Sequence, residues 1–316
     1  MSKLLITRPL PDRVVAAAQE TFDVALRPQN TPLSPAEIAE ALSGYDAVLP
    51  TLGDQFTAEA LQGAHRCRIL ANFGVGFNHI DAQAARAAGV VVTNTPGAVT
   101  DATADIAMTL MLMTCRRAGE GERMVRAGAW EGWHPTQLLG MHVTGKRIGI
   151  VGMGRIGKAI AQRAQAGFGM EVVFYNRSPV TDLPFPARQL PDLASVLAAA
   201  DVVVLAVPAT PQTHHLIDAA ALSAMSKHAF LINIARGDVV DEAALIDALQ
   251  HGAIAGAGLD VYELEPKVPA ALVAMENVTL LPHLGTSALE VREQMGMMAV
   301  DNLKAFFAGQ TPPNRV

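Results

Sequence analysis

One stretch of the chain decides its fold: Arg147-Ile148-Gly149-Ile150-Val151-Gly152-Met153-Gly154-Arg155-Ile156-Gly157. Its apolar start is typical of a buried strand, and the Gly-x-Gly-x-x-Gly pattern that follows is typical of a turn into a helix. In such a unit the first glycine permits a tight turn, the second lets the backbone approach a pyrophosphate, and the third packs helix against strand. The helix N-terminus then points free N–H groups at the phosphates. The stretch therefore predicts a dinucleotide-binding βαβ unit.

On both sides of this stretch, short strand-like runs alternate with helical segments. Strands are expected at residues 4–7, 47–49, 69–71, 90–93, 148–151, 172–175, 202–207, 230–234, 254–259 and 278–281. Helices are expected at residues 34–42, 101–126, 155–165, 242–250 and 288–307. Continuous apolar strands that alternate with helices predict parallel sheets covered on both faces. Because the strands are too many for one Rossmann unit, we expect an α/β fold of two doubly wound, Rossmann-like domains.

Composition and charge exclude several classes of protein. A chain of 316 residues predicts two domains. Its net charge of -6 argues against a nucleic-acid surface, which is usually basic. The longest apolar run, residues 106–115, is about half the length that spans a bilayer. The first residues do not form a secretory signal, so we expect a cytoplasmic protein.

Two further features of the composition concern assembly and thiols. Only 17% of residues are charged, below the roughly 25% typical of soluble domains, which favours a buried interface within an oligomer. Cys67 and Cys115 are too few for a disulfide framework and lie in apolar surroundings, so we expect buried thiols. No metal ion is expected.

The residues after the second strand of the dinucleotide unit bear on cofactor choice. The run 171–175 is followed by Asn176-Arg177-Ser178. An NAD-binding chain carries an acidic residue here, about 20 residues past the glycines, to hold the ribose hydroxyls. The acid is missing, and Arg177 could bind a 2′-phosphate through charge-assisted hydrogen bonds. The sequence favours NADP(H) over NAD(H), although a solvated surface arginine is the alternative.

Three polar residues follow successive strands in the second half of the chain. Arg236 follows the run 230–234, Glu265 follows 254–259, and His283 follows 278–281. Ligands bind at the carboxyl ends of strands in open α/β sheets. Hydride transfer between a dinucleotide and a substrate needs groups that hold and polarise the substrate and a group that donates or accepts a proton. Arg236, Glu265 and His283 are therefore the candidate catalytic residues.

At this point the chain resembles the D-isomer-specific 2-hydroxyacid dehydrogenases, and within them most closely the glyoxylate/hydroxypyruvate reductases. The resemblance covers nearly the whole chain. Its motifs are Asn72-Phe73-Gly74-Val75-Gly76, Asn94-Thr95-Pro96-Gly97, Gly145-Lys146-Arg147-Ile148-Gly149-Ile150-Val151-Gly152-Met153-Gly154, Asn233-Ile234-Ala235-Arg236-Gly237, Gly258-Leu259-Asp260-Val261, Glu265-Pro266 and Pro282-His283-Leu284-Gly285.

The resemblance implies a role for each candidate. His283 would be the acid that protonates the substrate oxygen, and Glu265 would hold its imidazole. Arg236 would bind both the carboxylate and the keto oxygen of the substrate. The backbone N–H groups of Val75 and Gly76 would complete the carboxylate cradle.

The resemblance also implies a set of cofactor contacts and a subunit contact. Trp133 would reach the substrate site of the neighbouring subunit in a homodimer. The expected cofactor-binding residues are Thr103, Gly152, Gly154, Arg155, Ile156, Gly157, Asn176, Arg177, Ser178, Val207, Pro208, Thr213, Ile234, Ala235, Asp260, His283 and Gly285.

The family fold implies a division of the chain and an activity. Residues 1–98 and 287–316 would form a discontinuous substrate-binding domain, and residues 99–286 the dinucleotide-binding domain, with the active-site cleft between them. The implied reaction is NAD(P)H-dependent reduction of a small 2-keto acid, with glyoxylate or hydroxypyruvate first, to the D-2-hydroxy acid. Reductases of a larger acid such as 2-ketogluconate, phosphoglycerate or formate dehydrogenases, and a dinucleotide-sensing binding protein remain as alternatives.

Overall fold

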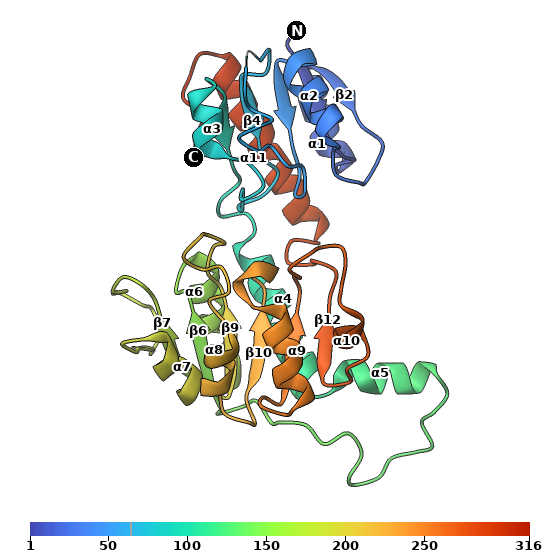
Figure 1. Ribbon diagram of the computed structural model, residues 1–316, viewed down its shortest axis with the longest axis vertical. Helices are drawn as coiled ribbons and strands as arrows, with labels where there is room; N and C mark the ends of the chain where they lie inside the picture. Colours follow the sequence, from blue (N-terminus) through green and yellow to red (C-terminus); the bar gives the residue numbers. More distant parts are fainter. Residues whose placement is uncertain (64) are drawn as a thin grey trace. The chain divides into compact units, whose positions relative to one another are not determined.

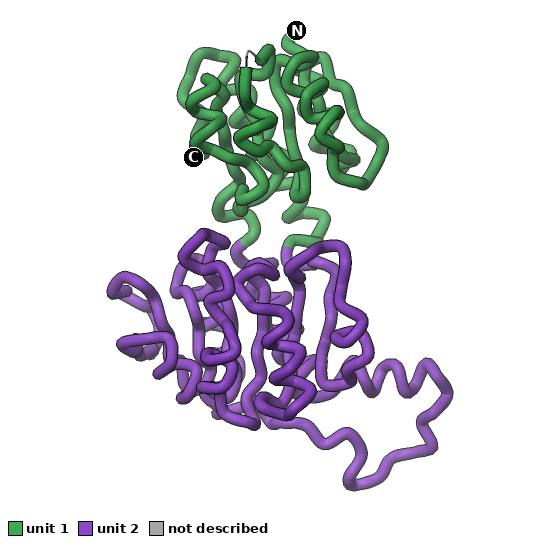
Figure 2. Tube along the Cα trace, viewed as in Figure 1, with its two compact units in different colours: residues 1–99, 286–316 green, residues 100–285 purple. Residues whose placement is uncertain are grey.

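The computed structural model describes residues 1–63 and 65–316, which form two compact units (Figure 2). Unit 1 comprises Met1–Val99 and Thr286–Val316, and unit 2 comprises Thr100–Gly285. Each unit holds one sheet, and all the strand pairs found in the described part of the chain are parallel.

Unit 1 is built on a five-stranded sheet with the strand order β2-β1-β3-β4-β5; Figure 1 labels its edge strand β2 and its inner strand β4. Its strands are β1 (Lys3–Ile6), β2 (Asp23–Leu26), β3 (Ala47–Leu49), β4 (Ile69–Ala71) and β5 (Val91–Thr93). Its helices are α1 (Asp12–Gln19), α2 (Pro35–Gly44), α3 (Ala82–Ala87) and α11 (Leu289–Phe307). One core cluster joins the strands to α2 and α3, and α11 packs on β4 and α1.

Unit 2 is built on a seven-stranded sheet with the order β12-β11-β10-β9-β6-β7-β8. Its strands are β6 (Arg147–Val151), β7 (Glu171–Tyr175), β8 (Arg188–Gln189), β9 (Val202–Leu205), β10 (Phe230–Asn233), β11 (Gly256–Leu259) and β12 (Val278–Leu280). Its helices are α4 (Thr100–Cys115), α5 (Ala118–Arg126), α6 (Arg155–Phe168), α7 (Leu193–Ala199), α8 (Ala219–Ala224), α9 (Glu242–Gln250) and α10 (Ala270–Val273), with a short 3₁₀ turn at Gly237–Val239.

Helices cover both faces of the unit 2 sheet. Because successive side chains of a strand point to opposite faces, neighbouring residues enter different cores. Ile150 packs in a cluster with residues of α4 and α6, whereas Val151 packs in one with residues of α7, α8 and α9. Burial on both faces explains why these strands are continuously apolar, and it confirms the predicted doubly wound α/β fold.

Two strands were not predicted from the sequence. β2 and β8 are both edge strands of their sheets. The residues of β2 are exposed or half-buried, and β8 is only two residues long. The two residues of β8 are polar and carry no apolar run, whereas β2 was missed although it holds the short run Val24-Ala25-Leu26.

The single helix expected at residues 101–126 is wrong, because the structure has two helices there. The first ends at Cys115, and Arg117 adopts a left-handed conformation with a φ of 53° before α5 begins. The Cys115 carbonyl accepts the Met141 N–H at 2.8 Å instead of continuing the helical ladder. The chain that returns to the sheet thus terminates α4, a long-range cause that local helix propensity does not register.

Both cysteines are buried and unlinked, as predicted. Cys67 is 2% exposed and Cys115 is fully buried. Burial raises the pKa of each thiol to about 12, so neither forms a thiolate at neutral pH. Among the described residues, no helix combines the length and the apolar character needed to cross a bilayer.

A buried carboxylate ties the carboxyl ends of β1 and β3 together in unit 1. Asp54 is fully buried, and its Oδ2 accepts the Thr7 hydroxyl at 2.6 Å and the Thr51 N–H at 2.9 Å. Its Oδ1 accepts the Leu33 N–H at 2.9 Å and lies 3.6 Å from Arg8 Nη2. One side chain therefore satisfies donors from three segments of the chain.

Asp54→Ala should destabilise the protein strongly, because it leaves buried donors without their acceptor and the Arg8 guanidinium without its ion-pair partner. Loss of one member of such a network costs about 3–5 kcal/mol, which corresponds to roughly 10 °C in the midpoint of thermal unfolding. Circular dichroism melts of the variant would measure this shift. Asp301→Ala, which removes an exposed acid from α11, is the control and should change stability by less than about 0.5 kcal/mol. Equal melting of the two variants would contradict the bracing role of Asp54.

Candidate active site

The residues predicted to act together in catalysis all follow strands of unit 2. Arg236 follows β10, Glu265 follows β11 and His283 follows β12. The His283 Nδ1 lies 2.9 Å from Glu265 Oε2, and both side chains are 29% exposed. The other oxygen of Glu265 accepts the Tyr262 N–H at 3.1 Å. The structure thus places an oriented imidazole–carboxylate pair at the carboxyl edge of the sheet, with the Nε2 of His283 on the side of the ring away from Glu265.

Charges around this pair favour an ionised Glu265. Burial opposes ionisation, but the hydrogen bond and charge of His283, the Tyr262 N–H and the Arg236 charge outweigh it and lower the pKa of Glu265. Burial lowers the pKa of the Arg236 guanidinium, while the carboxylates of Glu265 and Asp238 counter this effect. Arg236 Nη1 donates a hydrogen bond of 2.7 Å to the carbonyl of the preceding residue, Ala235. A cation, an anion and an imidazole therefore share one small region, as expected from the sequence.

Asp260 fixes the segment that carries His283. Its carbonyl accepts the His283 N–H at 2.9 Å, and its carboxylate accepts the N–H groups of Leu284 at 2.6 Å and Gly285 at 2.8 Å. Burial raises the pKa of Asp260, although these N–H groups and the His283 charge work against the shift. The Thr103 hydroxyl donates to the Gly285 carbonyl at 3.1 Å. Thr103, Asp260 and Gly285, each expected to contact the cofactor, thus form one connected group.

The three fingerprint glycines differ in what surrounds them. A Cβ on Gly157 would lie 2.1 Å from the Gly152 carbonyl oxygen, and one on Gly152, whose φ is 99°, would lie 2.7 Å from the Ala206 carbonyl oxygen. A Cβ on Gly154 would meet nothing within 4 Å. Open space therefore lies against the backbone at Gly154, where Arg155 and Ile156 begin α6. This is the arrangement that a pyrophosphate at a helix N-terminus requires, so the residues fit a dinucleotide.

The end of β7 leaves Arg177 and Ser178 exposed next to this loop. The Asn176 Oδ1 accepts the Met153 N–H at 3.2 Å, and its Nδ2 donates to the Ser178 carbonyl at 2.9 Å. Asn176 thereby joins the end of β7 to the glycine loop through a neutral amide.

Two further segments expected to contact the cofactor follow β9 and β10. After β9, the Thr213 hydroxyl donates to the Pro208 carbonyl at 2.7 Å and so closes the turn that begins beyond Val207. After β10, the N–H of Ala235 donates to Asn233 Oδ1 at 3.0 Å, and Ile234 is buried. These segments lie at the same edge of the sheet as the glycine loop, because all the strands are parallel.

The substrate-binding residues expected in unit 1 lie in a braced turn after β4. The Asn72 Nδ2 donates to the carbonyls of Gly74 and Gly76 at 3.0 Å, and the Asn94 Nδ2 donates to the Val75 carbonyl at 2.9 Å. Sequence reasoning quoted Asn72 and Asn94 only as members of motifs and missed their positioning role. Their place directly after β4 and β5, each beside a glycine-containing turn, is the signal that could have found them.

Trp133 belongs to the long segment between α5 and β6, which leaves the body of unit 2 in Figure 1. Its side chain is 80% exposed, and Trp130 and Leu139 of the same segment are also exposed. A cavity of about 610 Å³ lies between this segment and the amino ends of the strands, lined by residues such as Leu139, Phe230 and Val278. That cavity is at the opposite edge of the sheet from His283, so it is separate from the candidate active site.

Comparison with protein families gives a match to the model described as "D-isomer specific 2-hydroxyacid dehydrogenase, NAD binding domain" at residues 108–285. The chain is 44% identical over 322 residues to the glyoxylate reductase of Thermococcus kodakarensis, covering 99% of this chain and 96% of that protein. It is 41% identical over 319 residues to the glyoxylate reductase of Pyrococcus horikoshii, covering 99% and 95% of the two chains.

Solved structures are similar over the same length. The NADPH-dependent glyoxylate/hydroxypyruvate reductase of Sinorhizobium meliloti, in complex with NADP and malonate, matches with a TM-score of 0.89 and 36% identity over 100% of this chain and 96% of that one. A glyoxylate reductase from Paecilomyes thermophila matches with a TM-score of 0.89 and 30% identity over 100% and 98% of the chains.

Replacement of two fingerprint glycines should separate binding from folding. Gly154→Ala adds a methyl group to open space, so stability should hardly change, but the methyl occupies the position that a pyrophosphate needs and should weaken dinucleotide binding at least tenfold. Gly157→Ala places the methyl against the Gly152 carbonyl and should lower stability by about 1–3 kcal/mol through overpacking. Calorimetric titration with NADPH and thermal melts of both variants measure the two effects. A Gly154→Ala protein that binds NADPH like the parent would place the pyrophosphate elsewhere.

Proposed function

We propose that this chain, which belongs to the D-isomer specific 2-hydroxyacid dehydrogenase family, reduces glyoxylate, hydroxypyruvate or a similarly small 2-keto acid to the D-2-hydroxy acid. The family match and the identity to curated relatives confirm the family that was predicted from the motifs. The observation that carries the proposed reaction is the 2.9 Å pair of His283 and Glu265, at the carboxyl edge of the sheet that holds the glycine loop. The names of the similar proteins, which are glyoxylate and glyoxylate/hydroxypyruvate reductases, support the choice of substrate.

His283 acts as the proton donor in this reaction. When bound, the dinucleotide supplies the hydride that becomes the new C–H bond at the keto carbon. The electron pair of the carbonyl bond moves onto the oxygen, and this oxygen takes a proton from His283. Because Nδ1 faces Glu265, Nε2 is the nitrogen that delivers the proton. The ionised Glu265 stabilises the charged imidazole before transfer and keeps its ring in one orientation.

Arg236 binds the anionic end of the substrate. Its planar guanidinium can pair with a carboxylate through two parallel hydrogen bonds and still face a keto oxygen. Burial strengthens this attraction because little water screens it. The substrate-binding roles of Val75, Gly76 and Trp133, and of unit 1 as the substrate-binding domain, stay predictions.

NADP(H) is the preferred cofactor in this proposal. Asn176 stands where a ribose-binding acid would repel a 2′-phosphate, and its amide is already engaged with the glycine loop. Arg177 and Ser178 are exposed beside it and can bind the phosphate. The similar Sinorhizobium meliloti reductase is described as NADPH-dependent and was solved with NADP, which supports this choice.

We also propose that the protein is a homodimer that uses the segment between α5 and β6. Trp130 and Trp133 are 53% and 80% exposed, and Leu139 is 67% exposed, so three large apolar side chains of one segment lie at the surface, where a partner could cover them. A second copy of the chain is the partner that would cover it.

Turnover of a keto-acid panel tests the function and the cofactor choice together. Glyoxylate and hydroxypyruvate should be reduced faster than 2-ketogluconate, and NADPH should exceed NADH in kcat/KM by roughly ten- to hundredfold, the value of one charge-assisted hydrogen bond of about 1.5–3 kcal/mol. Arg177→Ala should remove most of the difference, chiefly through the KM for NADPH. Arg188→Ala, another exposed arginine of the same unit, is the control and should leave it unchanged. Preference for NADH in the parent enzyme would refute the role of Arg177, and NADPH binding without any turnover would indicate a sensor.

His283→Ala should lower kcat by about 10²–10⁴, the usual contribution of general acid catalysis, while the Kd for NADPH stays close to that of the parent. The control is His228→Ala, because His228 forms another imidazole–carboxylate pair in unit 2, 2.7 Å from Asp201. That variant should turn over normally. Steady-state kinetics and fluorescence titration of NADPH provide both quantities. Near-normal kcat for His283→Ala would remove this histidine from the mechanism.

A further inference from the structure

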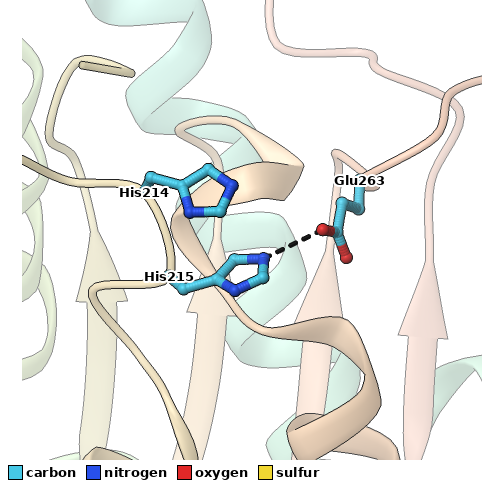
Figure 3. A group of neighbouring side chains, drawn as sticks. All are labelled: His214, His215 and Glu263. Carbon is cyan, nitrogen blue, oxygen red and sulfur yellow. Dashed lines mark hydrogen bonds and ion pairs between the residues drawn. The ribbon is translucent and has the colours of Figure 1, made fainter. Parts of the chain in front are cut away.

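A second group of titratable side chains lies at the carboxyl edge of the unit 2 sheet and has no part in the reaction proposed above. His214 and His215 follow β9, and Glu263 follows β11 (Figure 3). One ligand atom of each residue lies within 4.8 Å of the others, and His215 Nε2 is 2.9 Å from Glu263 Oε1. Figure 3 shows the two imidazole rings one above the other, with the Glu263 carboxylate facing the ring of His215.

The two histidines point to the same side because of an unusual backbone conformation. Adjacent side chains of an extended chain point in opposite directions. His215 has a φ of 48°, which few residues other than glycine adopt, and its ring stacks on that of His214 at 4.0 Å between centroids and 25° between planes. Such backbone conformations are costly and occur often where side chains bind ligands.

Backbone hydrogen bonds hold both histidines in this arrangement. The His214 N–H donates to the Thr210 carbonyl at 3.1 Å, and the His215 N–H donates to the Asp238 carbonyl at 2.8 Å. The ligand atoms therefore need only side-chain rotation to come together. In a tetrahedral zinc site with His and carboxylate ligands, neighbouring donor atoms lie about 3.3 Å apart, so the ligand atoms must approach one another by about 1.5 Å at most.

The charge around the histidine pair also favours a cation. Glu263 supplies one carboxylate, and Glu242 Oε1 accepts the Glu263 N–H at 3.4 Å, which brings a second carboxylate to the same segment. The side chains of His215 and Glu263 are 33% and 30% exposed, and His214 is exposed, so an ion has access from solvent.

From this geometry we infer that His214, His215 and Glu263 form a binding site for a divalent transition-metal ion, with Zn²⁺ the best match. Two imidazoles and one carboxylate are ligands that zinc takes readily, and a fourth position would remain for water or another ligand. Magnesium and calcium prefer sets of oxygen ligands and should bind far more weakly. No metal ion was expected from the sequence, in which 48 positions separate His215 from Glu263.

The position of the site links it to the cofactor-binding segment. His214 directly follows Thr213, whose hydroxyl closes the turn on Pro208, and Glu263 lies between Tyr262 and Glu265. A bound ion would join the segments after β9 and β11 and restrict their motion. If the proposed function holds, the restricted segment at Thr213 adjusts less readily to the dinucleotide. We therefore expect Zn²⁺ to raise the KM for NADPH, and this consequence rests on the proposed function.

Calorimetric titration of the full-length, untagged protein with ZnCl₂ tests the site directly. We expect one ion per chain, with binding at least about tenfold weaker in His214→Ala and in Glu263→Gln. His251→Ala is the matched control, because His251 also lies beside a carboxylate, 3.2 Å from Asp247, on an exposed helix end. It should bind Zn²⁺ like the parent. Absence of stoichiometric binding, or equal binding in His214→Ala and the parent, would overturn the site.

A second measurement separates this site from the proposed function. Co²⁺ added to the same proteins should give visible absorption bands of nitrogen and oxygen ligation in the parent and in His251→Ala but not in His214→Ala. Neither the spectrum nor the calorimetry requires turnover, so an inactive protein that binds the ion would reject only the proposed function. A KM for NADPH that Zn²⁺ leaves unchanged, in a protein with the site filled, would overturn the link to the cofactor-binding segment.

Discussion

The backbone at Gly237 packs directly on the backbone at Tyr262, and the arrangement of the candidate active site depends on this contact. A Cβ at position 237 would come within 1.8 Å of the Tyr262 carbonyl carbon, so no residue other than glycine fits there. Arg236 precedes this contact on one side, and on the other the Tyr262 N–H donates to Glu265. The cation and the carboxylate are thus positioned by packed backbone, and their mutual attraction only adds to an arrangement that already exists.

The same short segment also anchors the loop after β9. The carbonyls of Asp238 and Val239 accept the N–H groups of His215 and Ile217 at 2.8 and 3.0 Å. Three loops, from β9, β10 and β11, therefore meet at one 3₁₀ turn. Asp260 extends the connection to the segment of His283 through three hydrogen bonds. A site built in this way needs no rearrangement of charged groups when substrate binds, which is the condition for effective electrostatic stabilisation.

Much of this architecture could be predicted because its cause is local. The central strands are buried on both faces, so each is a continuous apolar run, and Arg236, Glu265 and His283 each follow such a run. The edge strand β8 consists of two polar residues and lacks that pattern, and the edge strand β2 was missed although it holds the run Val24-Ala25-Leu26. The break at Arg117 depends on Met141, and the braced turn at Val75 depends on Asn94, so neither could be found from neighbouring residues. The His214, His215 and Glu263 group was missed for the same reason, since only the sheet brings its members together.

Two imidazole–carboxylate pairs lie at this edge of the sheet, and distance alone does not assign their roles. Both His283–Glu265 and His215–Glu263 have a separation of 2.9 Å. Glu265 is held ionised by Arg236 and the Tyr262 N–H as well as by His283, and its histidine is anchored by Asp260. That environment places an oriented imidazole beside a group that binds carboxylates, which is what proton donation to a keto acid requires. His215 instead stacks on a second imidazole, so its surroundings offer additional ligand atoms rather than a substrate anchor. These different neighbours are the reason why we propose proton transfer for His283 and ion binding for His215.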